Sequence, residues 1–190
     1  MTPTLYLTRN GLLEPLGQSQ VFSYLRGLSQ DHAITLITYE KPEDMANKQA
    51  MAQARADCEA HGIAWRPKSF RRRPKLLAPA WNLFEMFWSA LKAARRGDAQ
   101  LIHARSYLPA AAAWVVFRLT GTPFIFDMRA LWPEELITAG RLHRGSNMHK
   151  VLVGLERRCL RDAAKVVSLT EAATHYLKQQ YPNELAYQDI

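Results

Sequence analysis

The chain has 190 residues, of which 48% are hydrophobic and 22% charged, and its formal net charge at pH 7 is +8. These proportions exclude an intrinsically disordered chain and fit one globular domain that buries roughly 70% of its unfolded surface. The longest apolar run, Leu108 to Phe117, is about half of the ~20 residues that a membrane-spanning helix needs, so no such helix is expected. The amino-terminal residues lack the basic start and long apolar stretch of a secretory signal, and we expect a cytoplasmic location.

Two cysteines occur, Cys58 and Cys159, and each falls among the apolar positions of a predicted helix. Neither belongs to a CxxC motif or to a cluster of cysteine and histidine. A disulfide framework or a zinc site requires such a grouping. We therefore expect two reduced thiols in the hydrophobic core and no metal site.

Short apolar runs alternate with longer stretches of helical periodicity, a pattern typical of a parallel α/β sheet rather than of a bundle or a sandwich. We predict a three-layer α/β domain with a mainly parallel sheet of six or seven strands and helices on both faces. The predicted strands are Thr4–Arg9, Ala33–Tyr39, Ile63–Arg66, Gln100–Ala104, Pro123–Asp127 and Lys165–Leu169. The predicted helices are Gln18–Gln30, Asp44–His61, Leu76–Arg96, Tyr107–Thr120, Asn147–Asp162 and Thr170–Gln180.

Polar residues follow four of the predicted strands, in the segments 10–19, 103–106 and 127–135 and at Thr170. In a parallel sheet, right-handed crossovers bring the loops after every strand to the same edge, where ligands of such folds bind. We therefore expect these segments to form one candidate site, with Thr170 as the contribution of the last strand.

The first of these segments holds two glycines six residues apart, Gly11 and Gly17, just before a predicted helix. Glycine lets the backbone approach a ligand, and the free N–H groups at a helix start favour a phosphate or a carboxylate. Gln18 and Ser19 lie at this helix start and complete the candidate substrate-binding loop. The spacing is neither GxGxxG nor a P-loop, so it does not indicate a nicotinamide or ATP site. The alternative is a turn that leads into a capped helix.

His103, Arg105 and Ser106 lie where the fourth predicted strand ends. The imidazole and the guanidinium are two residues apart, so both can project toward the same edge of the sheet. These groups are candidates for binding a substrate at that edge. The alternative for His103 is a structural role.

The segment from Phe124 to Glu135 is the most informative one in the chain. An apolar strand delivers the Asp127 carboxylate at its end, and a guanidinium, an indole and two more carboxylates follow. Carboxylates accept hydrogen bonds from sugar hydroxyls, and an indole offers a flat face, so the loop suits a polyhydroxylated substrate. The alternative is an ion pair that only orders the loop. The candidate substrate-binding residues here are Arg129, Trp132, Glu134 and Glu135.

Six basic residues and no acid lie between Arg66 and Lys75, so this segment carries most of the net charge. The helix that follows is apolar around most of its first part. Such a helix is either buried beside a solvated loop or rests on an anionic membrane, where each basic residue contributes about 1 kcal/mol. Binding of nucleic acid is not expected, because no recognition helix or aromatic sheet platform accompanies the segment. The candidate membrane contacts are Arg71, Arg72, Arg73 and Lys75.

Four segments, in this order, resemble the N-terminal domain of GT-B glycosyltransferases of the family 4-like group. They are Gly11–Gln20, His103–Tyr107, Phe126-Asp-Met-Arg129 with Trp132-Pro-Glu-Glu135, and Ser168–Ala173. The resemblance spans nearly the whole chain. It implies a Rossmann-like domain over residues 1–182 and the start of an interdomain linker over residues 183–190, with the donor-binding domain of the same enzyme lying beyond them.

The resemblance implies a retaining transferase that moves a sugar from a nucleotide-sugar donor to a glycan or lipid-linked acceptor, as in polysaccharide biosynthesis. In this family the N-terminal domain mainly binds the acceptor, so the domain alone is expected to be inactive. The nucleotide sugar is a co-substrate, and no tightly bound cofactor or metal is expected. The enzyme would act in the cytoplasm, including as a peripheral protein at the inner face of the membrane.

Single positions can be matched to the family's motifs. Gly11 and Gly17 match the glycine-containing loop near the donor phosphates, with Gln18 and Ser19 at its helix start. His103 matches the first histidine of a His-x-His pattern whose second position is Arg105 here, and Ser106 follows it. Asp127 stands where many relatives place a histidine that contacts the sugar near the reaction centre, which makes it the candidate catalytic residue.

Two other functions remain open on the sequence alone. The chain could be a non-catalytic module that docks on a membrane or a glycan, or a stand-alone nucleotide-binding domain. Binding that depends on anionic lipid would support the docking module. Tight binding of nucleotide sugars by this chain would support the stand-alone nucleotide-binding domain.

Overall fold

The computed structural model of the chain describes residues 1–75, 77–186 and 190. Its centre is a sheet of six strands in the order β3-β2-β1-β4-β5-β6, and every pair of neighbouring strands is parallel. The predicted α/β fold is confirmed. The strands are β1 Thr2–Thr8, β2 His32–Glu40, β3 Ala64–Ser69, β4 Leu101–Arg105, β5 Phe124–Met128 and β6 Lys165–Ser168.

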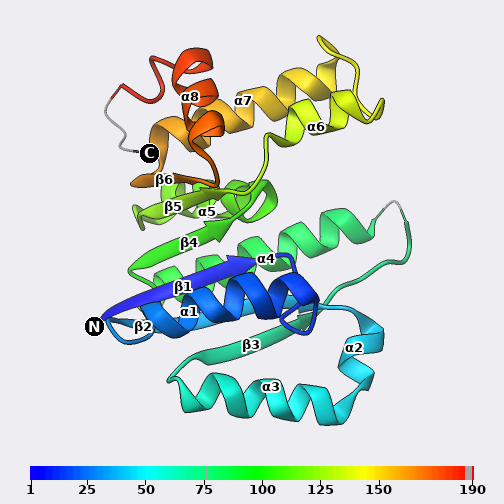
Figure 1. Cartoon of the computed structure of the whole chain (residues 1–190), viewed down its shortest axis with the longest axis vertical. Coiled ribbons are helices and arrows are strands. Elements are labelled where there is room, and N and C mark those ends of the chain that lie inside the picture. The colour runs from blue at the N-terminus through cyan, green and yellow to red at the C-terminus, as the bar shows by residue number, and fades with distance from the viewer. Residues whose placement is uncertain (76, 187–189) are drawn as a thin grey trace.

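Helices cover both faces of the twisted sheet (Figure 1). On one face, β1 and β2 share a core with the helices that follow them, including Val21, Leu25 and Cys58. On the other face, the strands pack against the longer helices that follow β3, β4 and β5. The helical elements are the π-helix η1 Gly17–Phe22, α1 Ser23–Leu28, α2 Pro42–Ala46, α3 Lys48–Ala60, α4 Ala78–Arg95, α5 Tyr107–Thr120, α6 Trp132–Thr138, α7 Asn147–Asp162 and α8 Glu171–Gln180.

The structure corrects the predicted helices at two places. The helix expected over Asp44–His61 is two helices, because Asn47 leaves helical geometry and its Oδ1 accepts a hydrogen bond from the N–H of Ala50, which caps α3. Residues 132–138, expected as part of a loop, form α6, which has proline in its first turn and two glutamates at its positive end. The predicted start of α4 at Leu76 lies outside the described residues.

Both cysteines lie in the core as predicted, and burial raises the pKa of each thiol to about 12. At the carboxyl end, Leu185 is buried with the core of the second face, while residues 187–189 lie outside the described part. The boundary between domain and linker at residue 182 stays a prediction. None of the described helices combines the length and the apolar composition that crossing a membrane requires.

The strand order fixes where a site can form. The chain leaves β1 toward one face of the sheet and leaves β4, its neighbour, toward the other face. In such sheets a crevice opens at the carboxyl ends of the two strands where the order reverses, and ligands bind there. The polar segments that follow β1, β4 and β5 all lie at this edge.

Candidate functional site

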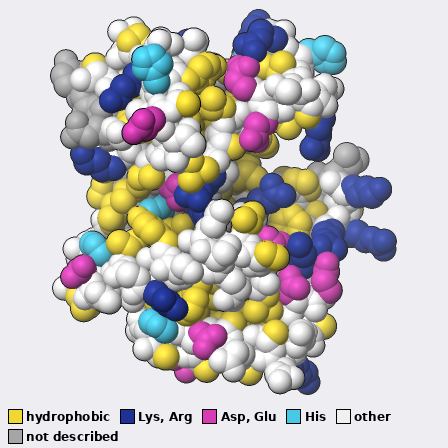
Figure 2. Space-filling model, viewed as in Figure 1, with side chains coloured by type: hydrophobic (Ala, Val, Ile, Leu, Met, Phe, Trp, Pro, Cys, Tyr) yellow, Lys and Arg dark blue, Asp and Glu magenta, His cyan; other side chains and the backbone are white. Residues whose placement is uncertain are grey.

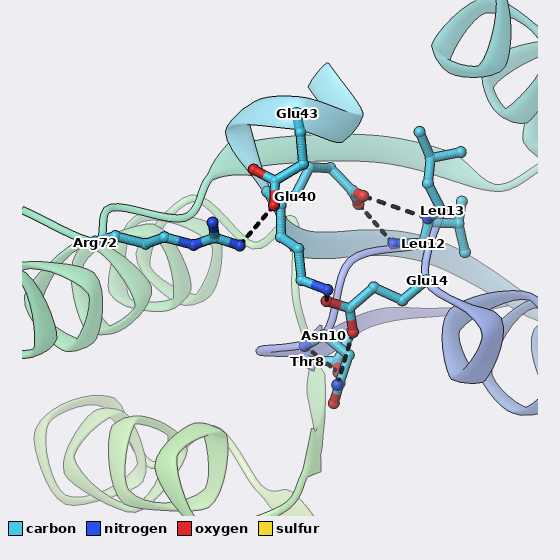
Figure 3. Close-up of polar contacts among 9 residues, drawn as sticks. Thr8, Asn10, Leu12, Leu13, Glu14, Glu40, Glu43 and Arg72 are labelled. Atoms are coloured by element: carbon cyan, nitrogen blue, oxygen red, sulfur yellow. Dashed lines mark hydrogen bonds and ion pairs between the residues drawn. The ribbon is translucent and has the colours of Figure 1, made fainter. Parts of the chain in front are cut away.

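The backbone of the loop after β1 is hydrogen-bonded to a buried carboxylate at the end of β2. Glu40 is fully buried, and its Oε1 accepts a hydrogen bond from the Thr38 hydroxyl at 2.6 Å. Oε1 also accepts one from the Leu12 N–H at 2.6 Å, and Oε2 accepts one from the Leu13 N–H at 3.3 Å (Figure 3). A Cβ at Gly11 would lie 2.5 Å from the same carboxylate. The amides of Leu12 and Leu13 therefore donate to Glu40.

The other predicted members of this loop also have partners within it. A Cβ at Gly17 would collide with the backbone carbonyl oxygens of Gly11 and Leu12, so glycine is required for the helix to approach the loop. The Gln18 amide donates to the Leu12 carbonyl at 2.9 Å, and the Ser19 hydroxyl donates to the Pro15 carbonyl at 2.7 Å. These contacts shape the loop, and a direct role of the residues in substrate binding stays a prediction.

Side chains from β4, from β5 and the residue that follows it, and from the helix after β1 form what we call the buried charge cluster: His103, Arg105, Asp127, Arg129 and Gln20. Arg105 lies opposite Asp127 in the sheet, and His103 lies opposite Tyr6, which packs into the core on the α1 side. Residues two apart share a face of a strand, so the cluster gathers on that side. The structure thus brings together the predicted His103, Arg105, Asp127 and Arg129.

Asp127 is the centre of this cluster and is 4% exposed. Its Oδ2 lies 3.4 Å from Nε2 of His103, and its Oδ1 lies 3.4 Å from Nη1 of Arg129. The His103 ring lies between two tyrosines, with centroids 4.5 Å from Tyr6 and 5.8 Å from Tyr24. Burial and the Asp127 charge raise the pKa of both tyrosines, so their hydroxyls stay protonated beside the carboxylate.

Gln20 joins the two arginines and was not predicted as a site residue. Its Oε1 accepts hydrogen bonds from Nη2 of Arg105 at 2.6 Å and from Nη2 of Arg129 at 2.9 Å. Burial lowers the pKa of Arg105 from its ordinary value. The only sequence signal for Gln20 was its place at the end of the quoted glycine motif.

Beside this cluster lies a cavity of about 340 Å³, which we call the edge pocket. Asn10 connects the two: its Oδ1 lies 3.4 Å from Nη1 of Arg105, and its Nδ2 donates to Glu14 at 3.1 Å. Glu14 also pairs with Lys41 at 2.9 Å (Figure 3). The predicted Ser106, Trp132 and Glu135 line this pocket, together with Arg9, Asn10, Glu14, Tyr39, Lys41, Phe70, Tyr107, Leu108, Pro109 and Ala130.

Ser106, which lines the edge pocket, has a strained backbone conformation. Its φ of 78° and ψ of 176° fall in a region that residues with a Cβ rarely adopt, and it directly precedes α5. Its N–H donates to the carbonyl of Asp127 at 2.8 Å, which ties the start of α5 to β5. Strain of this kind persists only where the surrounding structure fixes it, and it is common in ligand sites.

The aromatic wall of the edge pocket rests on a second buried carboxylate. The rings of Trp132 and Tyr107 lie 5.5 Å apart, and the Tyr107 hydroxyl donates to Glu156 of α7. The Tyr181 hydroxyl forms a further hydrogen bond to Glu156. Burial raises the pKa of Glu156 despite these hydrogen bonds.

Two predicted residues lie apart from the edge pocket. The Thr170 hydroxyl accepts a hydrogen bond from the N–H of Ala173 at 3.1 Å and caps α8. Glu134 is not among the residues that line the edge pocket, and its carboxylate pairs with Arg144 at 2.5 Å. The structure therefore does not unite all the post-strand segments in one site.

The basic segment before α4 is partly paired with the protein itself. The backbone N–H of Arg71 donates to the Asn82 side chain at 3.1 Å, and its guanidinium lies 4.7 Å from the centre of the Trp81 ring. Arg72 pairs with Glu43 at 2.8 Å (Figure 3). Arg73 and Lys75 are exposed. Figure 2 shows Lys and Arg side chains gathered along this segment.

The α4 helix is buried on one face and exposes aromatic residues on the other. One face is buried through residues such as Met86 and Ala90. The other face leaves three aromatic rings exposed, Trp81 at 46%, Phe84 at 53% and Trp88 at 43%. Single exposed apolar residues are common, but a contiguous aromatic row on one helix marks an interaction surface.

The family model of the glycosyl transferase 4-like domain matches residues 18–184. Comparison with curated protein sequences finds no match. Residues 18–184 include the buried charge cluster, α4 and three of the four segments on which the resemblance was based, and they begin within the fourth, the glycine motif.

Solved structures share the fold at low sequence identity. The Anabaena protein Alr3699/HepE, crystallised with UDP and glucose, is 13% identical with a TM-score of 0.60, covering 100% of this chain and 44% of that one. Arabidopsis thaliana UGT89C1 was solved with quercetin, at 9% identity and a TM-score of 0.57, and with UDP, at 10% and 0.59. Both structures cover 97% of this chain. The chain covers 46% of the protein chain in the quercetin complex and 50% of that in the UDP complex.

The chain thus spans about half the length of the solved structures it matches. The family match extends over most of the chain, and the fold of the solved structures agrees with the six-stranded parallel sheet. The chain therefore belongs to the glycosyl transferase 4-like domain family.

Proposed function

We propose that this chain is the acceptor-side half of a GT-B glycosyltransferase that transfers a sugar, with retention of configuration, from a nucleotide sugar to a glycan or lipid-linked acceptor. The edge pocket is the observation that carries the proposal. It lies at the carboxyl edge of a parallel sheet, where such folds bind ligands, and it presents an indole beside carboxylates and an amide. This lining suits a polyhydroxylated acceptor.

The residues have separate roles in this proposal. Trp132 offers its face to an acceptor sugar, and the carboxylates of Glu14 and Glu135 accept hydrogen bonds from its hydroxyls. Arg129 is the charged member of the buried cluster that reaches solvent, because its side chain is 24% exposed and that of Asp127 is 6% exposed. We assign to Asp127 the electrostatic stabilisation of a cation-like sugar, with His103 and Arg129 held in place around it.

The proposed reaction balances without a cofactor. The bond between the sugar C1 and the phosphate oxygen breaks, and its electron pair stays on the nucleotide diphosphate. The acceptor hydroxyl oxygen bonds to C1 on the same face, and its proton passes to the departing phosphate. The donor is a co-substrate contacted mainly by a second domain, and no step calls for a metal.

A transfer assay on the intact enzyme tests the proposal, with mass spectrometry of acceptor products and measurement of nucleotide diphosphate release. Trp132→Ala and Glu135→Gln should each lower kcat/KM about tenfold or more, since each removes a contact in the pocket. Glu134→Gln is the matched control, because this neighbouring carboxylate pairs with Arg144 outside the pocket. Equal effects of Glu134→Gln and Glu135→Gln would contradict the placement of the acceptor.

Calorimetry of the 190-residue chain with UDP-glucose addresses the stand-alone nucleotide binder. We expect weak binding or none, because the proposal assigns most donor contacts to a second domain. Tight binding would favour the stand-alone function.

A second candidate function, docking on an anionic membrane, is favoured by the exposed aromatic face of α4 beside Arg71 and Arg73. Exposed aromatic rings partition into the membrane interface, and neighbouring cations attract anionic lipid. This docking would hold the enzyme as a peripheral protein at the cytoplasmic face of a membrane.

Co-sedimentation with vesicles containing phosphatidylserine, at low and high salt, tests the docking. Arg71→Glu with Arg73→Glu should abolish salt-sensitive binding, and Trp88→Ser should weaken binding at both salt concentrations. Arg26→Glu, an exposed charge reversal on α1, is the control. Binding that does not depend on anionic lipid would remove this function.

A further inference from the structure

A second cavity of about 350 Å³ lies between the basic segment and the start of α4. We call it the apolar pocket. Much of its wall is hydrocarbon, from Phe70, Pro79, Leu83, Met86 and Leu108. A cavity of about 150 Å³ accommodates benzene, so this one has room for a chain of several methylene groups. Nothing in the proposed transfer to a soluble sugar uses it.

The apolar pocket is also lined by polar side chains, namely Arg9, Tyr39, Arg71, Arg72, Lys75 and Asn82. The Asn82 side chain is already used, since it donates to the Arg71 carbonyl at 2.9 Å and accepts from the N–H of the same residue. A sugar hydroxyl placed against the hydrocarbon part of the wall would lose its water without gaining a partner, which is costly. The pocket therefore suits hydrocarbon and disfavours a glycan.

The apolar pocket and the edge pocket meet at shared residues, of which Tyr39 and Arg9 are the polar ones. The Tyr39 hydroxyl is buried and has no hydrogen-bond partner among the described residues. A buried hydroxyl without a partner is uncommon in proteins and needs an explanation. A ligand oxygen at the junction of the two pockets would supply the missing partner.

The charges at the junction favour an anion. The Arg9 guanidinium lies 5.4 Å from the centre of the Phe70 ring and forms no ion pair within the described part of the chain. Arg71, Arg72 and Lys75 add positive charge around the apolar pocket, although Arg72 is paired with Glu43. One of the two carboxylates that line the edge pocket, Glu14, is already paired with Lys41.

We propose that the acceptor is an anionic lipid whose hydrocarbon chain fills the apolar pocket, whose phosphate lies at Arg9 and the Tyr39 hydroxyl, and whose hydroxyl-bearing head enters the edge pocket. This inference rests on the proposed function and names the acceptor class for it. It selects the lipid-linked acceptor over a soluble glycan. The exposed aromatic face of α4 lies on the same helix as the pocket wall, so a lipid could enter without leaving the membrane surface.

Calorimetry of the 190-residue chain with short alkyl phosphates, below their micelle concentrations, tests the site. Each buried methylene contributes about fourfold in affinity, so octyl phosphate should bind at least tenfold more tightly than butyl phosphate. Octanol should bind more weakly than octyl phosphate, because it lacks the anion. Equal affinities for octyl and butyl phosphate would overturn the proposal.

Different variants test the binding of the phosphate and the binding of the hydrocarbon chain. Tyr39→Phe and Arg9→Gln should each weaken octyl phosphate several-fold and leave octanol unchanged, and the fold should tolerate both because neither group has a hydrogen-bond or ion-pair partner among the described residues. Arg26→Gln is the charge control and should change nothing. Ala78→Phe, which fills the apolar pocket, should remove the difference between octyl and butyl phosphate. Leu83→Ser, at a half-buried wall position, tests the same point if Ala78→Phe does not fold.

The failures of this inference and of the proposed function are distinguishable. Chain-length selectivity without any detectable sugar transfer would leave a lipid phosphate site in a protein that is not a transferase. Transfer to soluble and lipid-linked acceptors at equal kcat/KM would keep the transferase and refute the lipid site. Chain-length selectivity that survives both Ala78→Phe and Leu83→Ser would also refute it.

Discussion

The buried charge cluster and the edge pocket lie side by side at the carboxyl edge of the sheet, yet the protein satisfies their polar groups to very different degrees. In the cluster, Asp127 contacts His103 and Arg129, and Gln20 accepts hydrogen bonds from two arginines, so that one buried donor, Nε of Arg129, is left without a partner in the described residues. At the edge pocket, the Tyr39 hydroxyl is buried without a partner in the described residues, and Ser106 holds strained backbone.

This difference indicates different roles for the two regions. A network in which most members satisfy one another is rigid and fixes geometry. Open polar groups and strain remain where a ligand completes the structure. We therefore interpret the cluster as the part that presents charge in a fixed place, and the edge pocket as the part that receives a substrate.

The largest expected effect comes from breaking the cluster at its centre. Asp127→Ala removes the carboxylate between His103 and Arg129 and leaves the buried Arg105 and the half-buried Arg129 uncompensated, which should lower the free energy of unfolding by about 3 kcal/mol. Asp127→Asn keeps the shape and should lose less. Urea denaturation of both variants measures the difference, and an alanine variant as stable as the wild type would show that the cluster is not a structural unit.

Glu40→Gln should have the next largest effect, because it loosens the loop that carries Asn10 between the two regions. Three donors converge on the Glu40 carboxylate, and a glutamine amide would turn an NH₂ group toward at least one of them. We expect a loss of about 2 kcal/mol in the free energy of unfolding. Glu59→Gln, on the exposed side of α3, is the control. A similar loss in both variants would contradict the role of Glu40.

Much of the fold could be predicted from the sequence because apolar runs mark buried parallel strands regardless of their partners. The predicted strand ends were within a few residues of the observed ones, and this placed His103, Arg105 and Asp127 at the correct edge. The predicted second strand stopped at Tyr39, one residue short of Glu40, so the carboxylate that organises the glycine loop was overlooked.

The contacts of the site were harder to predict because they depend on tertiary register. Gln20 meets Arg105 and Arg129 across 85 and 109 residues of chain, and no local pattern encodes such a pairing. Thr170 follows a strand like the others, but the sheet order places β6 at the far edge, and the hydroxyl caps a helix instead. Position after a strand therefore predicts the edge of the sheet and not the pocket.

Relieving the strain in the edge pocket should have a smaller effect of opposite sign. Ser106→Gly allows the observed φ of 78° without a Cβ and should raise the free energy of unfolding by about 1 kcal/mol. Ser106→Ala removes the same hydroxyl but keeps the Cβ, so it should bring no gain. Thermal unfolding of the two variants separates strain from loss of the hydroxyl, and equal melting temperatures would argue against strain at this position.

The smallest expected effect is a pH dependence of the free energy of unfolding, which comes from the buried carboxyl group behind the aromatic wall of the edge pocket. Burial raises the pKa of Glu156 above the ordinary 4.5, so the folded protein holds this proton more tightly than the unfolded chain does. The resulting stabilisation is complete below pH 4.5 and is lost as the pH rises through the raised pKa. Glu156→Gln cannot ionise, so its unfolding free energy relative to wild type should increase between pH 4.5 and pH 7.5. Denaturation at both pH values, with the exposed Glu171→Gln as control, measures this change, and a pH-independent difference would show that Glu156 does not titrate differently in the folded state.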